Sequence, residues 1–151
     1  MSCVIVETRR FGSLEIEEKD IIFIVGGMLG FEDKNKYILL DHDQETPFKW
    51  LQSIQDPELA FVVMEPFIFY PDYEFDLPEE DVRVLGLAKP EQARVFTVLV
   101  VPEDVKKITA NLKAPIVINL SNKKGKQVIL TDDRYPVKYP LFQAEQGQGG
   151  L

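Results

Sequence analysis

Acidic side chains are the most abundant residues in this sequence that could take part in chemistry, and six of them lie between positions 67 and 81. This stretch reads FIFYPDYEFDLPEED, contains no lysine or arginine, and interleaves its carboxylates with five aromatic rings. We call residues 67–81 the acidic–aromatic segment. Paired carboxylates can hydrolyse glycosidic bonds or hold a metal ion, but the spacing singles out no pair. The same composition is typical of a protein-binding rim in which acids surround aromatic anchors.

Other reactive residues are scarce. His42 is the only histidine and Cys3 the only cysteine, which excludes a Cys/His metal cluster. No serine lies in a GxSxG motif, and the glycine-rich stretch GGMLG at 26–30 matches neither phosphate-binding pattern, so we expect a turn there. The sequence therefore predicts no catalytic residue, no metal and no cofactor, and the protein is not expected to be an enzyme.

The chain of 151 residues has a formal net charge of −8, and the acidity lies in its first two thirds. Residues 1–102 hold 9 Lys and Arg against 20 Asp and Glu, whereas residues 103–151 hold 8 against 5. Nucleic acids are bound mainly through their phosphates, so we expect no direct nucleic-acid partner. An acidic surface favours a basic protein partner, although acidity also serves solubility.

Features of secreted or membrane proteins are absent from the sequence. No apolar run reaches the roughly 18 residues needed to cross a bilayer. The N-terminal stretch MSCVIVETRR does not resemble a signal peptide, and a single cysteine can form no internal disulfide. We expect a cytoplasmic protein with no membrane partner.

Short apolar, β-branched runs separated by glycine and proline predict many strands. We place them at 3–8, 13–17, 21–25, 36–41, 50–54, 59–64, 95–101, 114–119 and 127–132. The run 21–25 is continuous, which suits a strand buried on both faces. The last two strands are expected to form a hairpin in which Gly125 supplies a positive φ.

The best helix pattern opens at Pro78 and closes at Gly86, with three acids in its first turn. Residues 102–112 open similarly but then alternate, so helix and strand both remain open there. We predict a mainly β, single-domain antiparallel β-barrel-like fold with one or two short helices, spanning residues 1–142. The tail at 143–151, which contains AEQGQGGL, is expected to be disordered.

Two interpretations of the acidic–aromatic segment are open. In the first, Phe67, Phe69 and Phe75 face the core while the acids solvate a loop and cap the helix. In the second, the segment is a partner-binding rim, which also accounts for Tyr73 and for the uncompensated charge.

Four stretches, in this order and spacing, resemble the FliW family of flagellar assembly factors. They are GMLGFEDKNKYIL (27–39), PFKWLQSIQDPELAFVVMEP (47–66), YEFDLPEED (73–81) and NLKAPIVIN (111–119) followed by QVIL (127–130). The resemblance runs from about residue 4 to residue 142. The family often has a proline within its GLPGFE turn, where this chain has Leu29.

The resemblance implies a binding function. Proteins of this family bind the RNA-binding translational repressor CsrA, which relieves repression of flagellin mRNA, and they alternately bind new flagellin near its termini. CsrA is basic where it grips RNA, and the family is understood to act away from that RNA site, through a coupling between two sites.

We therefore predict a partner-binding surface. Phe31 and Glu32 are a second candidate site, although Phe31 could instead lie in the core while Glu32 solvates the glycine turn. Trp50 is expected in the core. The main predicted surface residues are Tyr73, Glu74, Phe75, Asp76, Glu79, Glu80 and Asp81. The alternative functions are an acidic β-barrel adaptor for an unrelated basic protein, or a carboxylate-dependent hydrolase.

Overall fold

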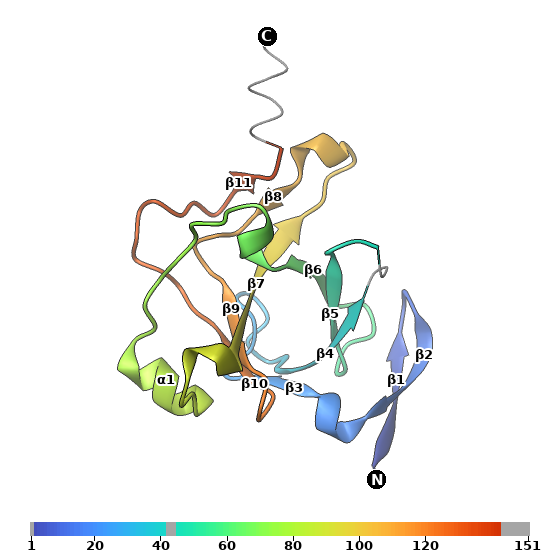
Figure 1. Ribbon diagram of the computed structural model, residues 1–151. Coiled ribbons are helices and arrows are strands. Elements are labelled where there is room, and N and C mark those ends of the chain that lie inside the picture. The colour runs from blue at the N-terminus through green and yellow to red at the C-terminus, as the bar shows by residue number, and fades with distance from the viewer. Residues whose placement is uncertain (1, 42–44, 143–151) are drawn as a thin grey trace.

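The computed structural model describes residues 2–41 and 45–142, and within them seven strands close into a barrel (Figure 1). The pairing of β7 with β9 closes the ring. The predicted mainly β barrel is confirmed, with one exception to its antiparallel pairing, because β3 and β10 run parallel. The barrel strands are β3 (Ile22–Ile24), β4 (Lys36–Asp41), β5 (Lys49–Ser53), β6 (Ala60–Met64), β7 (Ala93–Val100), β9 (Ile116–Asn119) and β10 (Lys124–Gln127).

Apolar side chains from the inward-facing strand positions fill the barrel. In β9, for example, Ile116 and Ile118 point inward while Val117 packs outside, as the two-residue alternation of a strand requires. The buried residues of this core are Ile22, Ile24, Met28, Tyr37, Leu51, Val63, Phe96, Ile116 and Ile118.

Strand β3 is buried on one face only. Ile22 and Ile24 belong to the barrel core, whereas Phe23 between them is 39% exposed. The prediction of burial on both faces is therefore wrong, because the outer face of β3 is open to solvent at this point.

Gly125 lies inside β10 and has no positive φ. A Cβ there would lie 2.9 Å from Cδ1 of Ile24 and 3.1 Å from Cγ1 of Ile118, so the barrel core leaves no room for a side chain. The left-handed residue of the β9–β10 turn is Lys123, with φ 60°. A hairpin after β9 is confirmed by the β9–β10 pairing, but its second strand begins at Lys124, inside the predicted loop, and the predicted role of Gly125 is wrong.

The strand predicted at 127–132 is wrong in position, because β10 covers Lys124–Gln127 and shares only Gln127 with it. Val128 and Leu130 still donate backbone hydrogen bonds to carbonyls of segment 113–115. The return bonds are missing because one residue of that segment is proline and the amides of the other two donate to the side chain of Asn111. A one-sided ladder of this kind is not a regular strand.

Further elements lie outside the barrel. The hairpin of β1 (Cys3–Thr8) and β2 (Gly12–Glu17), followed by the 3₁₀ turn η1 (Glu18–Asp20), stands beside the ring on the right of Figure 1. The open question at 102–112 is resolved by the 3₁₀ turn η4 (Val105–Lys107) and the short β8 (Thr109–Ala110), which pairs with β11 (Tyr139–Pro140). The turns η2 (Pro66–Ile68) and η3 (Pro90–Gln92) complete the structure. The predicted tail at 143–151 and His42 lie outside the described residues.

The predicted helix is confirmed as α1 (Glu79–Leu85). Pro78 is its N-cap residue, and Gly86 ends it in the left-handed conformation with φ 66°. The side-chain amide of Asn119 donates to the carbonyl of Leu85 at 2.7 Å, which ties the helix end to β9. This contact fixes the helix on the outside of the barrel.

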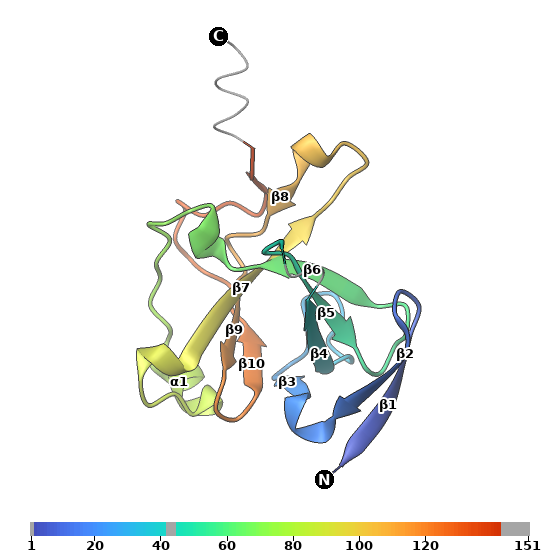
Figure 2. The ribbon, with the colours of Figure 1, turned by 45° about the vertical axis from the view of Figure 1, so that its right-hand side comes forward.

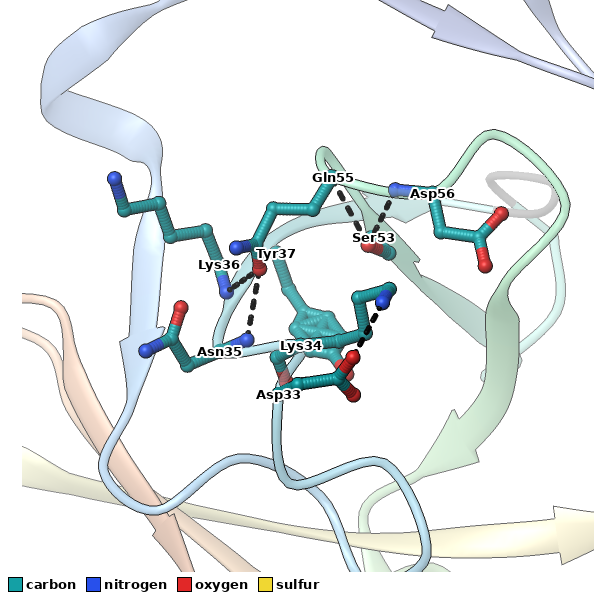
Figure 3. Close-up of polar contacts among 8 residues, drawn as sticks. All are labelled: Asp33, Lys34, Asn35, Lys36, Tyr37, Ser53, Gln55 and Asp56. Carbon is teal, nitrogen blue, oxygen red and sulfur yellow. Dashed lines mark hydrogen bonds and ion pairs between the residues drawn. The ribbon is translucent and has the colours of Figure 1, made fainter.

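A polar network orders the turns at one end of the barrel (Figure 3). The Oε1 atom of Gln55 accepts from the amides of Asn35 and Lys36, and Oγ of Ser53 accepts from the amides of Gln55 and Asp56. These bonds satisfy backbone groups that no strand pairs. The end of β5 and the start of β4 are therefore held together by side chains.

Candidate partner-binding surface

The acidic–aromatic segment begins in η2 and runs down the flank of the barrel into α1, as the connection from β6 to β7 (Figure 2). Below it lies a core cluster outside the barrel, to which Leu85, Leu112 and Tyr135 contribute. Residues 74–77 alternate between exposed acids and half-buried apolar side chains. This alternation holds the segment down while presenting its carboxylates to solvent.

Tyr73 belongs to the core rather than to the surface. It is 3% exposed, its hydroxyl donates to the carbonyl of Leu112 at 2.6 Å, and its ring centroid lies 4.6 Å from that of Tyr135. Burial, followed by the nearby Tyr135, raises the pKa of the Tyr73 phenol far above its ordinary value. The side chain therefore anchors the segment, and we leave it out of the proposed surface.

Asp81 is the second predicted surface residue that the structure places inside. It is 6% exposed and forms an ion pair with Lys126 of β10. The helical repeat accounts for its position, because Asp81 and Leu85, four residues apart, share the face of α1 that meets the barrel. Its charge is compensated and fixes α1 on β10.

Four predicted acids do lie at the surface: Glu74, Asp76, Glu79 and Glu80. None of them takes part in a salt bridge among the described residues. Phe75 is half-buried between the first two. The structure therefore brings these five side chains together along one short stretch.

An apolar groove of about 470 Å³ lies between residues 74–77 and the start of β7, next to α1. Phe67, at its edge, is 47% exposed, and the neighbouring Ile68 is 53% exposed. The interpretation that put Phe67 in the core is therefore wrong, because η2 turns this side chain outward. We refer to this site below as the apolar groove. Its main lining residues are Phe67, Phe75, Leu77, Val82, Leu87 and Val95.

The second guess, Phe31 and Glu32, lies in the glycine turn. Gly26, Gly27 and Gly30 all have positive φ, which confirms the predicted turn. Phe31 is 40% exposed with its ring centroid 5.6 Å from that of Phe61, so it is not a core residue. The carboxylate of Glu32 accepts from the amide of Gly30 at 3.1 Å, which is a turn-stabilising role.

A second groove, of about 560 Å³, was not predicted from the sequence. It lies on the outer face of β5 and β6, where Trp50 is half-buried and the guanidinium of Arg10 lies 4.4 Å from the ring centroid. The placement of Trp50 in the core is wrong, because Leu51 occupies the inward position of β5. Strand alternation, with Leu51 inside, was the signal that could have placed Trp50 outside.

The described residues contain no group of three or more His, Cys, Asp or Glu able to hold a metal ion. The pKa of Asp33, Asp41 and Asp132 is lowered by hydrogen bonds to Lys34, Lys49 and Arg134 respectively. A catalytic acid requires a shift in the opposite direction. In the part of the chain that the structure describes, no helix is long and apolar enough to span a membrane.

A family model described as FliW protein matches residues 5–141 of this chain. The chain belongs to the FliW family. A flagellar assembly factor FliW from Caldicellulosiruptor saccharolyticus is 48% identical over 139 residues, covering 92% of this chain and 91% of its own length. The FliW family member from Bdellovibrio bacteriovorus, also described as a flagellar assembly factor, is 38% identical and covers 92% of this chain and 79% of its own length.

A solved structure agrees with the fold. The crystal structure of a flagellar assembly factor FliW superimposes with a TM-score of 0.85 and 40% identity, covering 91% of this chain and 96% of that one. The barrel, its helix and the connection that carries the acidic–aromatic segment thus belong to a fold already seen in the FliW family.

Proposed function

We propose that this flagellar assembly factor works by binding proteins in the cytoplasm and not by catalysis. It binds the translational repressor CsrA, relieves repression of flagellin mRNA, and alternately holds flagellin in a chaperone-like manner. Free flagellin would then withdraw the antagonist from CsrA and reduce further flagellin synthesis.

One observation carries the proposal: exposed acids that form no salt bridge with any described residue border an apolar groove. Glu74 and Asp76 line that groove, and Glu79 and Glu80 follow on the exposed side of α1. Such a rim attracts a basic protein over distance, while the groove supplies the apolar contacts that hold it. CsrA suits this surface, because a protein that grips RNA phosphates must carry basic patches.

Flagellin suits the same surface for another reason. Its termini are amphipathic and unfolded before assembly, and an amphipathic helix binds by laying its apolar face into a groove. Phe67, which is 47% exposed, gives the apolar groove an accessible edge. If both partners use this groove, their alternation follows from overlap of the two footprints.

Titration calorimetry tests the proposal directly. The protein is titrated into CsrA, and the complex is then challenged with monomeric flagellin. We expect tight binding to CsrA that flagellin abolishes. If neither CsrA nor flagellin binds at physiological salt, the proposal is refuted. Binding to CsrA without any affinity for flagellin would instead support an adaptor for basic proteins.

Charge reversal tests the assignment of the surface. The double variant Glu79→Lys, Glu80→Lys should bind CsrA at least tenfold more weakly and with a shallower dependence on salt concentration. Glu15→Lys with Glu103→Lys is the matched control, because both residues are exposed and the change in net charge is the same. Equal affinities of the two double variants would remove α1 from the interface.

A further inference from the structure

Two chain segments that flank one cavity each leave backbone groups without a partner. The first is residues 128–131, whose side chains alternate between buried and exposed. Val128 and Leu130 donate to segment 113–115 on one side. In an extended chain the N–H and C=O groups of neighbouring residues point to opposite edges, so those of Ile129 and Thr131 point away from 113–115.

The second segment is residues 74–77, which alternate between exposed and half-buried in the same way. Among the described residues, the amide N–H of Glu74 has no backbone partner and donates instead to the hydroxyl of Tyr135 at 3.1 Å. Among the described residues, no hydrogen bond pairs the backbone groups of Phe75, Asp76 or Leu77. Because Asp76 is two positions after Glu74, its backbone groups point to the same edge, toward the chain around Tyr135.

A cavity of about 470 Å³ lies between the two segments, and both of them line it. It is separate from the apolar groove, which lies on the other side of residues 74–77. Both segments run along the same flank of the barrel in Figure 1 and Figure 2. We call this cavity the strand slot, and its lining residues include Glu74, Phe75, Asp76, Ile129, Thr131 and Asp132.

We propose that the strand slot receives an extended segment of the partner protein, which adds as a β-strand between residues 74–77 and 128–131. Backbone hydrogen bonds to a free strand edge supply affinity in this binding mode, and side chains at alternate positions supply specificity. This proposal rests on the proposed function in one respect: the extended segment is taken to belong to the basic partner protein.

The lining of the slot defines the chemistry of the segment. Glu74 and Asp76 have no salt-bridge partner among the described residues, whereas Asp132 is already bound by Arg134 at 2.7 Å. Ile129 is 59% exposed and Phe75 is half-buried, so both offer apolar surface. The slot therefore fits a segment in which basic and apolar residues alternate, with the basic ones reaching Glu74 and Asp76.

A synthetic peptide tests the slot without the natural partner. The probe is an acetylated, amidated hexapeptide of alternating lysine and valine, added to the full chain up to millimolar concentration and followed by amide NMR. We expect shifts at residues 75–77 and 129–131, and at least tenfold slower hydrogen exchange at the amides of Ile129 and Thr131. No shifts, or shifts without slower exchange, would overturn the proposal.

Backbone-modified probes separate strand addition from simple charge attraction. Two control peptides carry N-methyl groups on the three valines or on the three lysines. Because the slot has a free edge on each side, we expect both controls to bind at least tenfold more weakly than the parent peptide. Equal binding of all three peptides would show a purely electrostatic contact and overturn the proposal.

A pair of variants makes the same distinction on the protein side. Asp76→Asn loses the charge but keeps the backbone amide, whereas Asp76→Pro loses both. We expect the proline variant to bind the peptide more weakly than the asparagine variant, with equal melting temperatures confirming that both are folded. If the proline variant is unfolded, Thr131→Pro on the opposite side of the slot replaces it.

Titration with CsrA distinguishes failure of the slot from failure of the proposed function. If CsrA binds and leaves exchange at Ile129 and Thr131 unchanged, the slot proposal is wrong and the proposed function stands. If the peptide binds as expected and CsrA does not bind, the slot stands and the proposed function is wrong.

Discussion

Two regions of this protein are rich in polar side chains, yet they use them in opposite ways. In the β5–β6 turn, Nε2 of the fully buried Gln52 donates to the carbonyls of Ser53 and Leu59 at 3.0 and 3.1 Å. In the acidic–aromatic segment, Glu74 and Asp76 extend into solvent without a salt-bridge partner among the described residues. The first region uses polarity to hold its own backbone, and the second leaves polarity available to a partner.

This contrast matters because both regions lie in the stretches by which the sequence resembles the FliW family. The stretch around Gln52 and Ser53 is explained by the turn that its side chains hold together. Among the described residues, Glu74 and Asp76 satisfy no comparable need of the fold. A family-like motif therefore points to binding only where the structure leaves its polar groups without a use.

The largest expected effect separates two aromatic residues of one segment. Tyr73→Ala removes a buried ring and a buried hydrogen bond, so we expect the free energy of unfolding to fall by about 3–5 kcal/mol. Phe67→Ala removes a ring that is 47% exposed and should change it far less, while weakening partner binding. Urea unfolding and calorimetry measure the two quantities, and equal stability losses would contradict the distinction.

The next effect concerns the three acids at the start of α1. Asp81→Lys places a second cation beside Lys126 in a nearly buried position, and we expect a loss of about 2–3 kcal/mol. The double variant Glu79→Lys, Glu80→Lys should lose less stability to unfolding, because only the interaction of the two side chains with the helix N-terminus is reversed. Thermal unfolding followed by circular dichroism compares them. A more stable Asp81→Lys variant would show that the ion pair does not hold the helix.

A smaller loss of stability is expected when Gln52 of β5, which holds the β5–β6 turn, is replaced. Gln52→Leu keeps the volume but removes the side-chain donor to the carbonyls of Ser53 and Leu59, and the Leu59 carbonyl still accepts from the amide of Ser53. The substitution also removes the buried Oε1 of Gln52, which has no partner among the described residues, so we expect a loss of only about 1 kcal/mol of stability. Binding of CsrA and flagellin should be unchanged when measured well below the melting temperature. Weaker binding with unaltered stability would mean that this turn also belongs to the interface.

The last effect is absent at neutral pH and appears only at high pH. Burial, with lesser contributions from Asp33 and Asp56, raises the pKa of Tyr37 to about 12. A raised pKa in the folded state gives stability that is fully present below the ordinary value of about 10 and is lost as pH rises through about 12. Unfolding in urea at pH 8, 10 and 12 should show this decline. In the Tyr37→Phe variant the free energy of unfolding should fall less steeply between pH 8 and 12. An equally steep fall would contradict the assignment of this pH dependence to Tyr37.

Strand positions and the helix could be predicted because their signals are local. Pro78 and Gly86 mark the two ends of α1 by their own backbone preferences, and alternation locates most strands. Gly125 and the strand expected after Gln127 were mispredicted because tertiary neighbours decide them. The barrel core leaves no room beside Gly125, and the Asn111 side chain occupies amides that a ladder needs.

The candidate site was predictable only in part, for a related reason. Composition located the acidic–aromatic segment, but it could not tell Tyr73 and Asp81, which face inward, from Glu74 and Asp76, which face outward. That division depends on which residues of β10 and of segment 128–135 lie beneath the segment. Alternation along 73–77 and the helical spacing of Asp81 and Leu85 divide these residues into two faces, but only neighbours distant in sequence decide which face is covered.

The parallel pairing of β3 with β10 also sets when the proposed binding surface can form during synthesis. Phe23, near the start of the chain, pairs with Lys124, near its end, so the barrel cannot close until most of the chain has left the ribosome. Lys126, which holds α1, and residues 128–131, which form one wall of the strand slot, follow directly after this last barrel strand. A nascent or truncated chain therefore lacks one wall of the proposed strand slot, and a partner that needed both walls would bind only finished molecules.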